Sequence, residues 1–207
     1  WKHAAFTLDI EAAADGSRDG PKLLARYVLR NTGDRARTFV LTLTVRPWQV
    51  NPPQQFLSTQ GGAAPIRSLR YGFGSLVVNA LTPLHFTQPA QRVAALGFDG
   101  GVGLAALQAA PALHALEDVQ AHASATLEFP IVLAPGGSAV VGWTAPLGLT
   151  AESDASITAD ALESRFDAVA ARWRERLNHV TLEVPPDAQR VVDTLRTSLA
   201  HILISRQ

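Results

Sequence analysis

Cysteine and methionine are both missing from this sequence of 207 residues. Without cysteine the chain can form no disulfide, use no thiolate in catalysis and hold no zinc through sulfur. The first residue is Trp1 instead of methionine, so we expect the chain to be a processed or excised part of a longer protein. The lack of disulfides does not fix the compartment, because a large β-domain can be secreted without them.

An excess of charge of either sign is missing as well. The 18 Lys and Arg residues balance the 18 Asp and Glu residues, so charge gives no reason to expect a nucleic acid or an anionic membrane as partner. Uninterrupted apolar runs fall short of the roughly 20 residues that span a bilayer. The composition has 47% hydrophobic and 17% charged residues, which is typical of a chain that buries a core.

Apolar and polar residues alternate over most of the first 150 residues, which predicts β-strands. Glycine and proline separate the runs. The longer runs lie at 3–12, 22–31, 37–45, 119–133 and 138–144, and shorter ones at 66–71, 76–79, 84–87 and 92–98. Many short strands without intervening helices favour a mainly β, antiparallel β-sandwich of the supersandwich type. The Ala/Leu-rich segment 103–117, broken by Pro111, is either a short helix or a loop at the edge of the sandwich.

The stretch RARTFVLTLTVRPWQV at 35–50 is the most regular of these strands. Most of its apolar residues fall on one side, which we expect to be the core side, and Val40 falls on the other with the threonines. The short Asn/Gly/Asp loop at 31–34 predicts a hairpin that pairs this strand with 22–31. Pro47 has no amide donor and should end the strand. The residues expected to face the core are Phe39, Leu41, Leu43 and Val45.

The pattern becomes helical after about residue 150, which divides the chain into a β-sandwich domain at 1–150 and a helical segment at 151–207. Thr158 or Asp160 can cap a first helix that reaches Leu177. The short alternation VTLEV at 180–184 predicts a strand. Pro185 and Pro186 then begin a second helix with a long apolar stripe. That stripe has no stop signal before Gln207.

Two segments resemble a known group of enzymes. These are RFDAVAARWRERLNHVTLEVPPDAQRVVDTLRTSLAHILISR at the C-terminal end and RYVLRNTGDRARTFVLTLTVRPWQ in the β-rich part. Both are similar to bacterial members of the glucoamylase-like, six-hairpin glycosidase group, which includes glycoside phosphorylases. In that group a galactose mutarotase-like supersandwich precedes an (α/α)6 catalytic barrel, and a helical linker joins them.

The resemblance implies a non-catalytic accessory domain of a larger carbohydrate-active enzyme. Its partner would be the C-terminal catalytic domain of the same polypeptide, a glycoside hydrolase or phosphorylase, whose cleft the sandwich would support or shape. The group's general acid and base lie on barrel loops, and no residue of this sequence matches them. On this interpretation the present chain has no catalytic residue and needs no cofactor.

Aromatic residues are the remaining lead to a binding surface. Flat aromatic rings can stack on sugars, but their large apolar area is more often used for packing. Residues proposed to contact carbohydrate or a neighbouring domain are Trp48, Arg46, Tyr71 and Phe73. The apolar stripe of the second helix would face the missing domain with Val192, Leu195, Leu199 and Leu203.

Two other functions stay open. The chain could be an autonomous carbohydrate-binding module, with Trp48 in its site. It could also be a free-standing mutarotase-like enzyme, because His85, His122 and Glu128 lie on predicted strands. No His-x-His, His-x-x-x-His or Gly-x-Ser-x-Gly motif is present, so the sequence predicts neither a local metal site nor a serine nucleophile.

Overall fold

The computed structural model describes residues 1–16, 20–48, 64–101, 103–147 and 156–205. The chain forms two compact units, Trp1–Glu163 and Ser164–Gln207. The predicted domain boundary at residue 150 lies outside the described residues. The division between the two units falls inside helix α2 (Ala159–Leu177).

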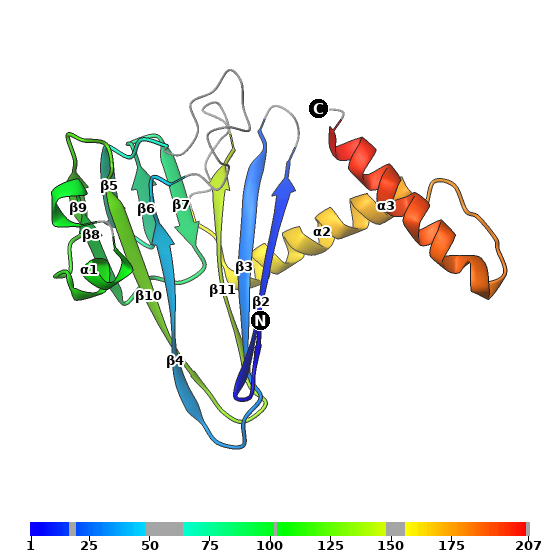
Figure 1. The fold of residues 1–207 in the computed structure, drawn as a ribbon, viewed down its shortest axis with the longest axis horizontal. Helices are drawn as coiled ribbons and strands as arrows, with labels where there is room; N and C mark the ends of the chain where they lie inside the picture. Colours follow the sequence, from blue (N-terminus) through cyan, green and yellow to red (C-terminus); the bar gives the residue numbers. More distant parts are fainter. Residues whose placement is uncertain (17–19, 49–63, 102, 148–155, 206–207) are drawn as a thin grey trace. The chain divides into compact units, whose positions relative to one another are not determined.

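Most of the regular elements of the first unit are strands, as Figure 1 shows. Its elements are β1 (Lys2–His3), β2 (Phe6–Asp15), β3 (Lys22–Asn31), β4 (Arg37–Val45), β5 (Ser68–Gly72), β6 (Ser75–Val78), β7 (Thr82–Phe86), β8 (Arg92–Leu96), η2 (Phe98–Gly100), α1 (Leu104–Ala109), β9 (Ala115–Glu117), β10 (Ser124–Leu133), β11 (Ser138–Pro146) and the start of α2. The second unit contains the rest of α2, then η3 (Pro186–Ala188) and α3 (Gln189–Ser205).

The strands form two antiparallel sheets. An eight-stranded sheet has the order β1-β2-β3-β11-β7-β6-β5-β9, and a three-stranded sheet has the order β4-β10-β8. The prediction of a mainly β, antiparallel sandwich-like fold with two C-terminal helices is therefore confirmed. Among the described helices, none combines the length and the apolar character that crossing a bilayer requires.

The hydrophobic core lies between the two sheets. Strand β10 contributes every second residue to it, because side chains alternate between the faces of a strand. The predicted core face of β4 is confirmed, since its apolar residues pack against this cluster. Central members of the core are Leu69, Leu76, Phe86, Val93, Leu127, Phe129 and Val141.

The predicted hairpin between β3 and β4 is wrong. Strand β3 pairs with β2 and β11, whereas β4 pairs with β10 in the other sheet. The buried side chain of Asn31 explains the crossing, because its amide donates to the carbonyls of Arg35 (2.8 Å), Leu133 (3.1 Å) and Ala134 (3.2 Å). Asn31 thereby ties the β3–β4 connection to the β10–β11 connection, and both lead from one sheet to the other.

The helical predictions hold and the strand predicted beside them does not. Ala161 donates its backbone N–H to Thr158 Oγ1 at 3.2 Å, so Thr158 caps α2. The chain after Pro185 turns into η3 and α3 as expected. Residues 180–184, however, are not a strand. Their alternation finds no partner strand in the described chain, and a single strand without backbone pairing is not stable.

The first turn of α2 rests on the face of the eight-stranded sheet that points away from the core. Leu162 is fully buried there above Gly142 of β11, where an added Cβ would lie 2.1 Å from Leu162 Cδ2. Arg26 of β3 reaches two carboxylates on the same face, Glu11 at 2.7 Å and Glu163 at 3.5 Å. The absence of a side chain at position 142 therefore makes room for the start of α2.

Candidate functional site

Trp48 lies in a row of three rings at one end of the three-stranded sheet. Its ring centroid is 5.8 Å from that of His122, and the His122 centroid is 5.5 Å from that of Phe98. Trp48 follows the end of β4, Phe98 follows the end of β8, and His122 precedes the start of β10. Trp48 is 42% exposed and Phe98 is 46% exposed. We call Trp48, His122 and Phe98 the aromatic row.

Hydrogen bonds fix His122 in the middle of the aromatic row. Its ring Nδ1 lies 2.6 Å from the carbonyl oxygen of Gln120. A carbonyl can only accept, so Nδ1 carries the hydrogen and the Nε2 of a neutral ring is left as an acceptor. Asp118 accepts from the backbone N–H groups of His122 at 2.7 Å and Phe98 at 3.4 Å. One carboxylate therefore positions two of the three rings.

Polar atoms without partners lie next to the aromatic row. The register pairs Val45 with Ala125, so the next residues outward, Arg46 and Ser124, are neighbours on the outer face. The Arg46 Nε, the Ser124 hydroxyl and the Thr126 hydroxyl are buried and have no hydrogen-bond partner within the described chain. Each such atom costs about 1–3 kcal/mol when it is left unpaired. Exposed rings at the Arg-Pro-Trp corner therefore occur together with buried polar atoms of Arg46 and β10 that lack a partner in the described chain.

The other two predicted contact residues lie elsewhere. Tyr71 of β5 packs against the core, and its hydroxyl accepts the N–H of Ala90 at 2.7 Å. Phe73 is fully exposed at the β5–β6 turn, with a positive φ of 50° that aromatic residues rarely adopt. Ile66 bridges to His122, and the seven residue steps from Ile66 to Phe73 span roughly 23 Å along an extended strand. Phe73 therefore does not belong to the aromatic row.

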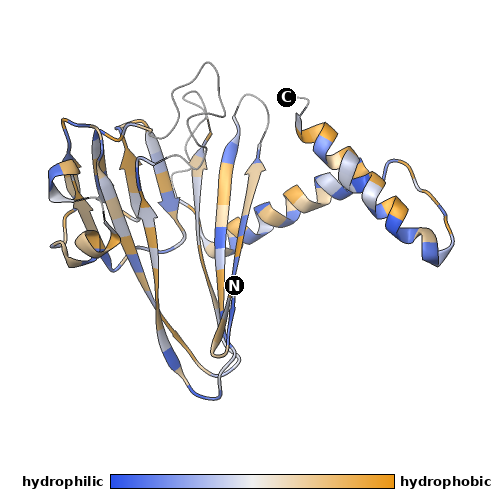
Figure 2. Cartoon of the chain, viewed as in Figure 1, coloured by the Kyte–Doolittle hydropathy of each residue, from blue (hydrophilic) through white to orange (hydrophobic). Residues whose placement is uncertain are grey.

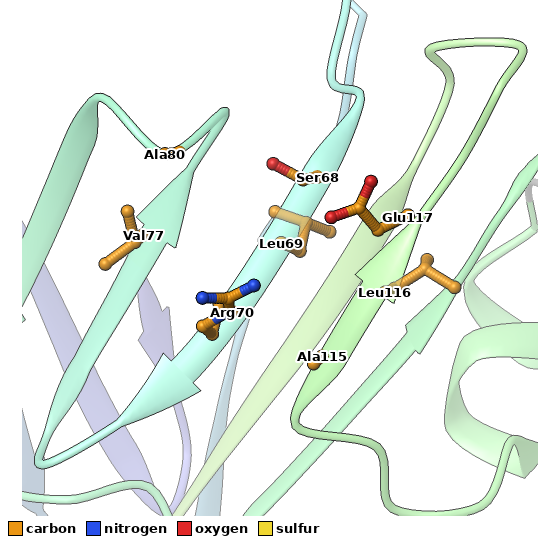
Figure 3. A pocket seen from close by; sticks show the side chains of 8 residues that line it. All are labelled: Ser68, Leu69, Arg70, Val77, Ala80, Ala115, Leu116 and Glu117. Carbon is orange, nitrogen blue, oxygen red and sulfur yellow. The ribbon is translucent and has the colours of Figure 1, made fainter.

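An open hollow of about 360 Å³ lies on the outer face of the eight-stranded sheet, at β5, β6 and β9 (Figure 3). Arg70 and Glu117 border it from adjacent strands. The side chain of Asn79 fixes one wall, since it bonds to the backbone of Pro65, Arg67 and Ser68. None of the residues that the sequence singles out lines this hollow.

The apolar stripe of α3 is covered on one flank only. Val192 is 2% exposed and Leu203 is partly buried, whereas Leu195 is 53% and Leu199 39% exposed. Successive residues turn by 100° around a helix, so Val191, Leu195, Leu199 and Ile202 form one continuous strip. All four are exposed in the structure. Hydrophobic residues recur along the whole of α3 in Figure 2.

The residues considered for a mutarotase-like activity are not brought together. His85 lies on the outer face of the eight-stranded sheet, where its Nδ1 is 2.6 Å from the Ser75 hydroxyl. Glu128 lies on the outer face of the other sheet and pairs with Arg92 at 2.6 Å. The described residues also contain no group of three or more His, Asp or Glu side chains placed to hold a metal ion.

The sequence singles out Arg46 and Trp48, and names His122 only for a mutarotase-like activity; it gives no indication of Phe98 or Asp118. His122 does lie on the polar side of the alternating run at 119–133, which is the one signal that the sequence offered. Its neighbours in the aromatic row follow strands β4 and β8, whose pairing with β10 the sequence does not reveal. The comparisons with known proteins name no family, because neither a protein-family model nor a curated protein matches the chain.

Proposed function

We propose that this chain is a non-catalytic accessory β-sandwich domain of a larger carbohydrate-active enzyme, which it supports by binding a helical catalytic domain along α3. The observation that carries the proposal is the exposed strip of Val191, Leu195, Leu199 and Ile202. Large aliphatic side chains at one helical face favour contact with another apolar surface over contact with water. The resemblance to glucoamylase-like enzymes supplies the identity of that partner.

The strip has the dimensions of a helix–helix contact. From Val191 to Ile202 it extends over about 17 Å of helix, given a rise of about 1.5 Å per residue. Its members are three or four residues apart, which is the spacing of the ridges that interlock when helices pack. The opposite face of α3 is polar, with Arg190, Asp193 and Thr197. A single helix or a pair of helices from the partner domain would cover the strip.

The most direct test is the reading frame beyond Gln207. We expect it to continue into a helical segment with pairs of carboxylates on its loops, as glycoside cleavage requires. A stop codon at that point contradicts the proposal. If the frame continues, the isolated 207-residue chain should turn over no glycoside, whereas the longer polypeptide should be a glycosidase or phosphorylase.

A pair of variants tests the role of α3. Leu195→Glu with Leu199→Glu should leave the unfolding of the isolated chain within about 0.5 kcal/mol of wild type, because both side chains are exposed. In the longer polypeptide the same variant should lower the melting temperature and the activity together. The matched control, Arg190→Glu with Thr197→Glu on the polar face, should do neither. Equal effects of both variants in the longer polypeptide would argue against docking through this strip.

A further inference from the structure

Strand β4 has one open edge that lacks the features by which proteins normally protect such edges. It pairs with β10 over its full length without a bulge, and the described strands place no partner on its other side (Figure 1). Edge strands are usually short, bulged, or marked by proline or lysine. β4 has nine residues and none of these features, and its one charged residue is Arg37 at its start. A second strand can therefore add to this edge.

The other open edges of the described sheets are protected. β1 has two residues and β9 has three. The part of β2 that β1 does not cover carries Asp9, Glu11 and Asp15, whose like charges oppose pairing with the same edge of a second copy. On the outer side of β8, the carbonyl of Val93 already accepts the N–H of Leu113. The edge of β4 is therefore unlike the others.

The hydrogen bonds of β10 show which backbone groups of β4 point to the open side. The carbonyl of Glu128 accepts the N–H of Gln91, which directly precedes β8, so the backbone of Glu128 points toward β8. Backbone groups alternate between the two sides along a strand. Leu127 and Phe129 therefore point toward β4, where they lie opposite Leu43 and Leu41. The residues of β4 whose N–H and C=O point to the open side are Thr38, Val40, Thr42 and Thr44, and we call them the free edge of β4.

The apolar side chains of β4 are also incompletely covered. Leu41 and Leu43 are only partly buried, although they face the core. The residues opposite them on β10, Phe129 and Leu127, are 1% and 0% exposed. A further strand beside β4 would cover the flank of these leucines as well as pair the backbone.

The free edge of β4 is complementary to itself. When two β4 strands pair antiparallel with Leu41 at the centre, Thr38 lies opposite Thr44 of the second copy and Val40 lies opposite Thr42. These are the four residues whose backbone groups point to the open side. Each of these opposite pairs exchanges two hydrogen bonds in an antiparallel ladder. One register therefore satisfies the whole free edge.

The same register matches the side chains. Leu41 lies opposite its own copy and Phe39 lies opposite Leu43, so apolar residues meet on the core side. Arg37 lies opposite Val45, so no like charges meet across the pair. Pairs of this kind stabilise antiparallel strands, whereas like charges directly opposite each other destabilise them. The best match for the free edge of β4 is therefore a second copy of β4.

We propose that two copies of this chain dimerise by antiparallel pairing of their β4 strands about a two-fold axis at Leu41. The pairing joins the two three-stranded sheets into one continuous sheet. Both copies use the same surface in such a contact, so the assembly closes at the dimer. The dimer involves no residue of α3, and it does not depend on the docking role proposed for that helix.

Sedimentation equilibrium of the 207-residue chain tests the proposal. With rising concentration the average mass should increase from 22.1 kDa to twice that value and then stay constant. We expect a dimer Kd between about 1 and 100 µM, because pairing of one strand edge is a small interface.

Two edge variants test the role of β4. Thr42→Pro removes an N–H that points to the open side, so it costs no hydrogen bond to β10 and is compatible with an edge strand. It should raise the dimer Kd by about tenfold or more. Val40→Lys with Thr42→Lys places four cations around the two-fold axis, should have the same effect, and decides the question if the proline variant does not fold. The control Leu195→Glu with Leu199→Glu should leave the Kd unchanged.

A single cysteine tests the register, because the natural sequence contains none. Opposite Cα atoms in a pair without hydrogen bonds are about 4.5 Å apart, which is within the range of a disulfide. Under mild oxidation Leu41→Cys should therefore link two copies to near completion. Phe73→Cys, an exposed control outside β4, should link them far less.

Four results would each overturn the proposal. The first is a chain that stays monomeric at about 300 µM, well above the expected Kd. The second is a mass that keeps growing beyond the dimer. The third is a dimer that survives in a folded edge variant or that is lost in the α3 variant, with far-UV circular dichroism as the check on folding. The fourth is Leu41→Cys linking no more than Phe73→Cys.

Discussion

Replacing Gly142 with alanine should destabilise the protein, although the same change in an ordinary strand position is favourable. Glycine inside a strand costs about 0.5–1 kcal/mol relative to alanine. At position 142, however, the new Cβ would lie 2.1 Å from Leu162 Cδ2 and 2.9 Å from the carbonyl oxygen of Ala25. Both distances are far inside van der Waals contact, so the Leu162 side chain or the backbone around it must shift from its packed position.

The size of the effect follows from what Leu162 loses. Its side chain is fully buried, and exposing a leucine costs about 1.5–3 kcal/mol. Crowding of a packed site costs typically about 1–3 kcal/mol. After the gain of removing a strand glycine, we expect Gly142→Ala to lower the free energy of unfolding by about 1–3 kcal/mol.

A double-mutant cycle isolates the cause. Leu162→Ala alone should cost about 2–5 kcal/mol. Once Leu162 is truncated, the alanine at position 142 meets mainly the carbonyl of Ala25, so the double variant should cost at least about 1 kcal/mol less than the sum of the single variants. Gly72→Ala is the matched control, because an added Cβ there meets nothing within 4 Å. It should be neutral or stabilising.

Urea unfolding, followed in parallel by tryptophan fluorescence and far-UV circular dichroism, measures these differences. Two probes are needed because the chain has two compact units, which can unfold in separate steps. A neutral or stabilising Gly142→Ala would refute the reasoning. Strict additivity in the cycle would do the same, because it would mean that Leu162 and position 142 do not meet.

Three further predictions concern the sandwich itself. Asn31→Ala should cost about 2–4 kcal/mol in chemical unfolding, because one buried and two partly buried carbonyls lose their donor. Asn31→Asp should cost more, since it faces them with a carboxylate, and a milder effect of Asp contradicts this. Phe73→Asn should raise the free energy of unfolding by about 0.5–1 kcal/mol, and with it the melting temperature, because Asn suits a left-handed turn position. A lower melting temperature would show that the Phe73 ring packs on this chain. Arg92 donates hydrogen bonds to Glu128 and to the carbonyls of Gln108 and Ala110 at the end of α1. Arg92→Met should therefore reduce the hydrogen-exchange protection of α1 without unfolding the sheets. Unchanged protection would exclude this anchoring role.

The sequence alone determined the elements whose pattern is local. Alternation located β3 and β4 to within a residue or two and identified Phe39, Leu41, Leu43 and Val45 as the core face. Helical periodicity and the Thr158 cap located α2. These features depend on residues close to each other in the chain, so short-range periodicity and capping are sufficient to predict them.

Only the tertiary structure decided which strands pair and therefore what surrounds Trp48. A loop of turn-forming residues after β3 is compatible with a hairpin and with a crossing between sheets, and the buried bonds of Asn31 to Leu133 and Ala134 favour the crossing. That crossing places β4 beside β10 and brings His122 to Trp48, although 74 positions separate them in the sequence. Pairing between distant strands depends on the summed energy of the whole core, which no local pattern contains.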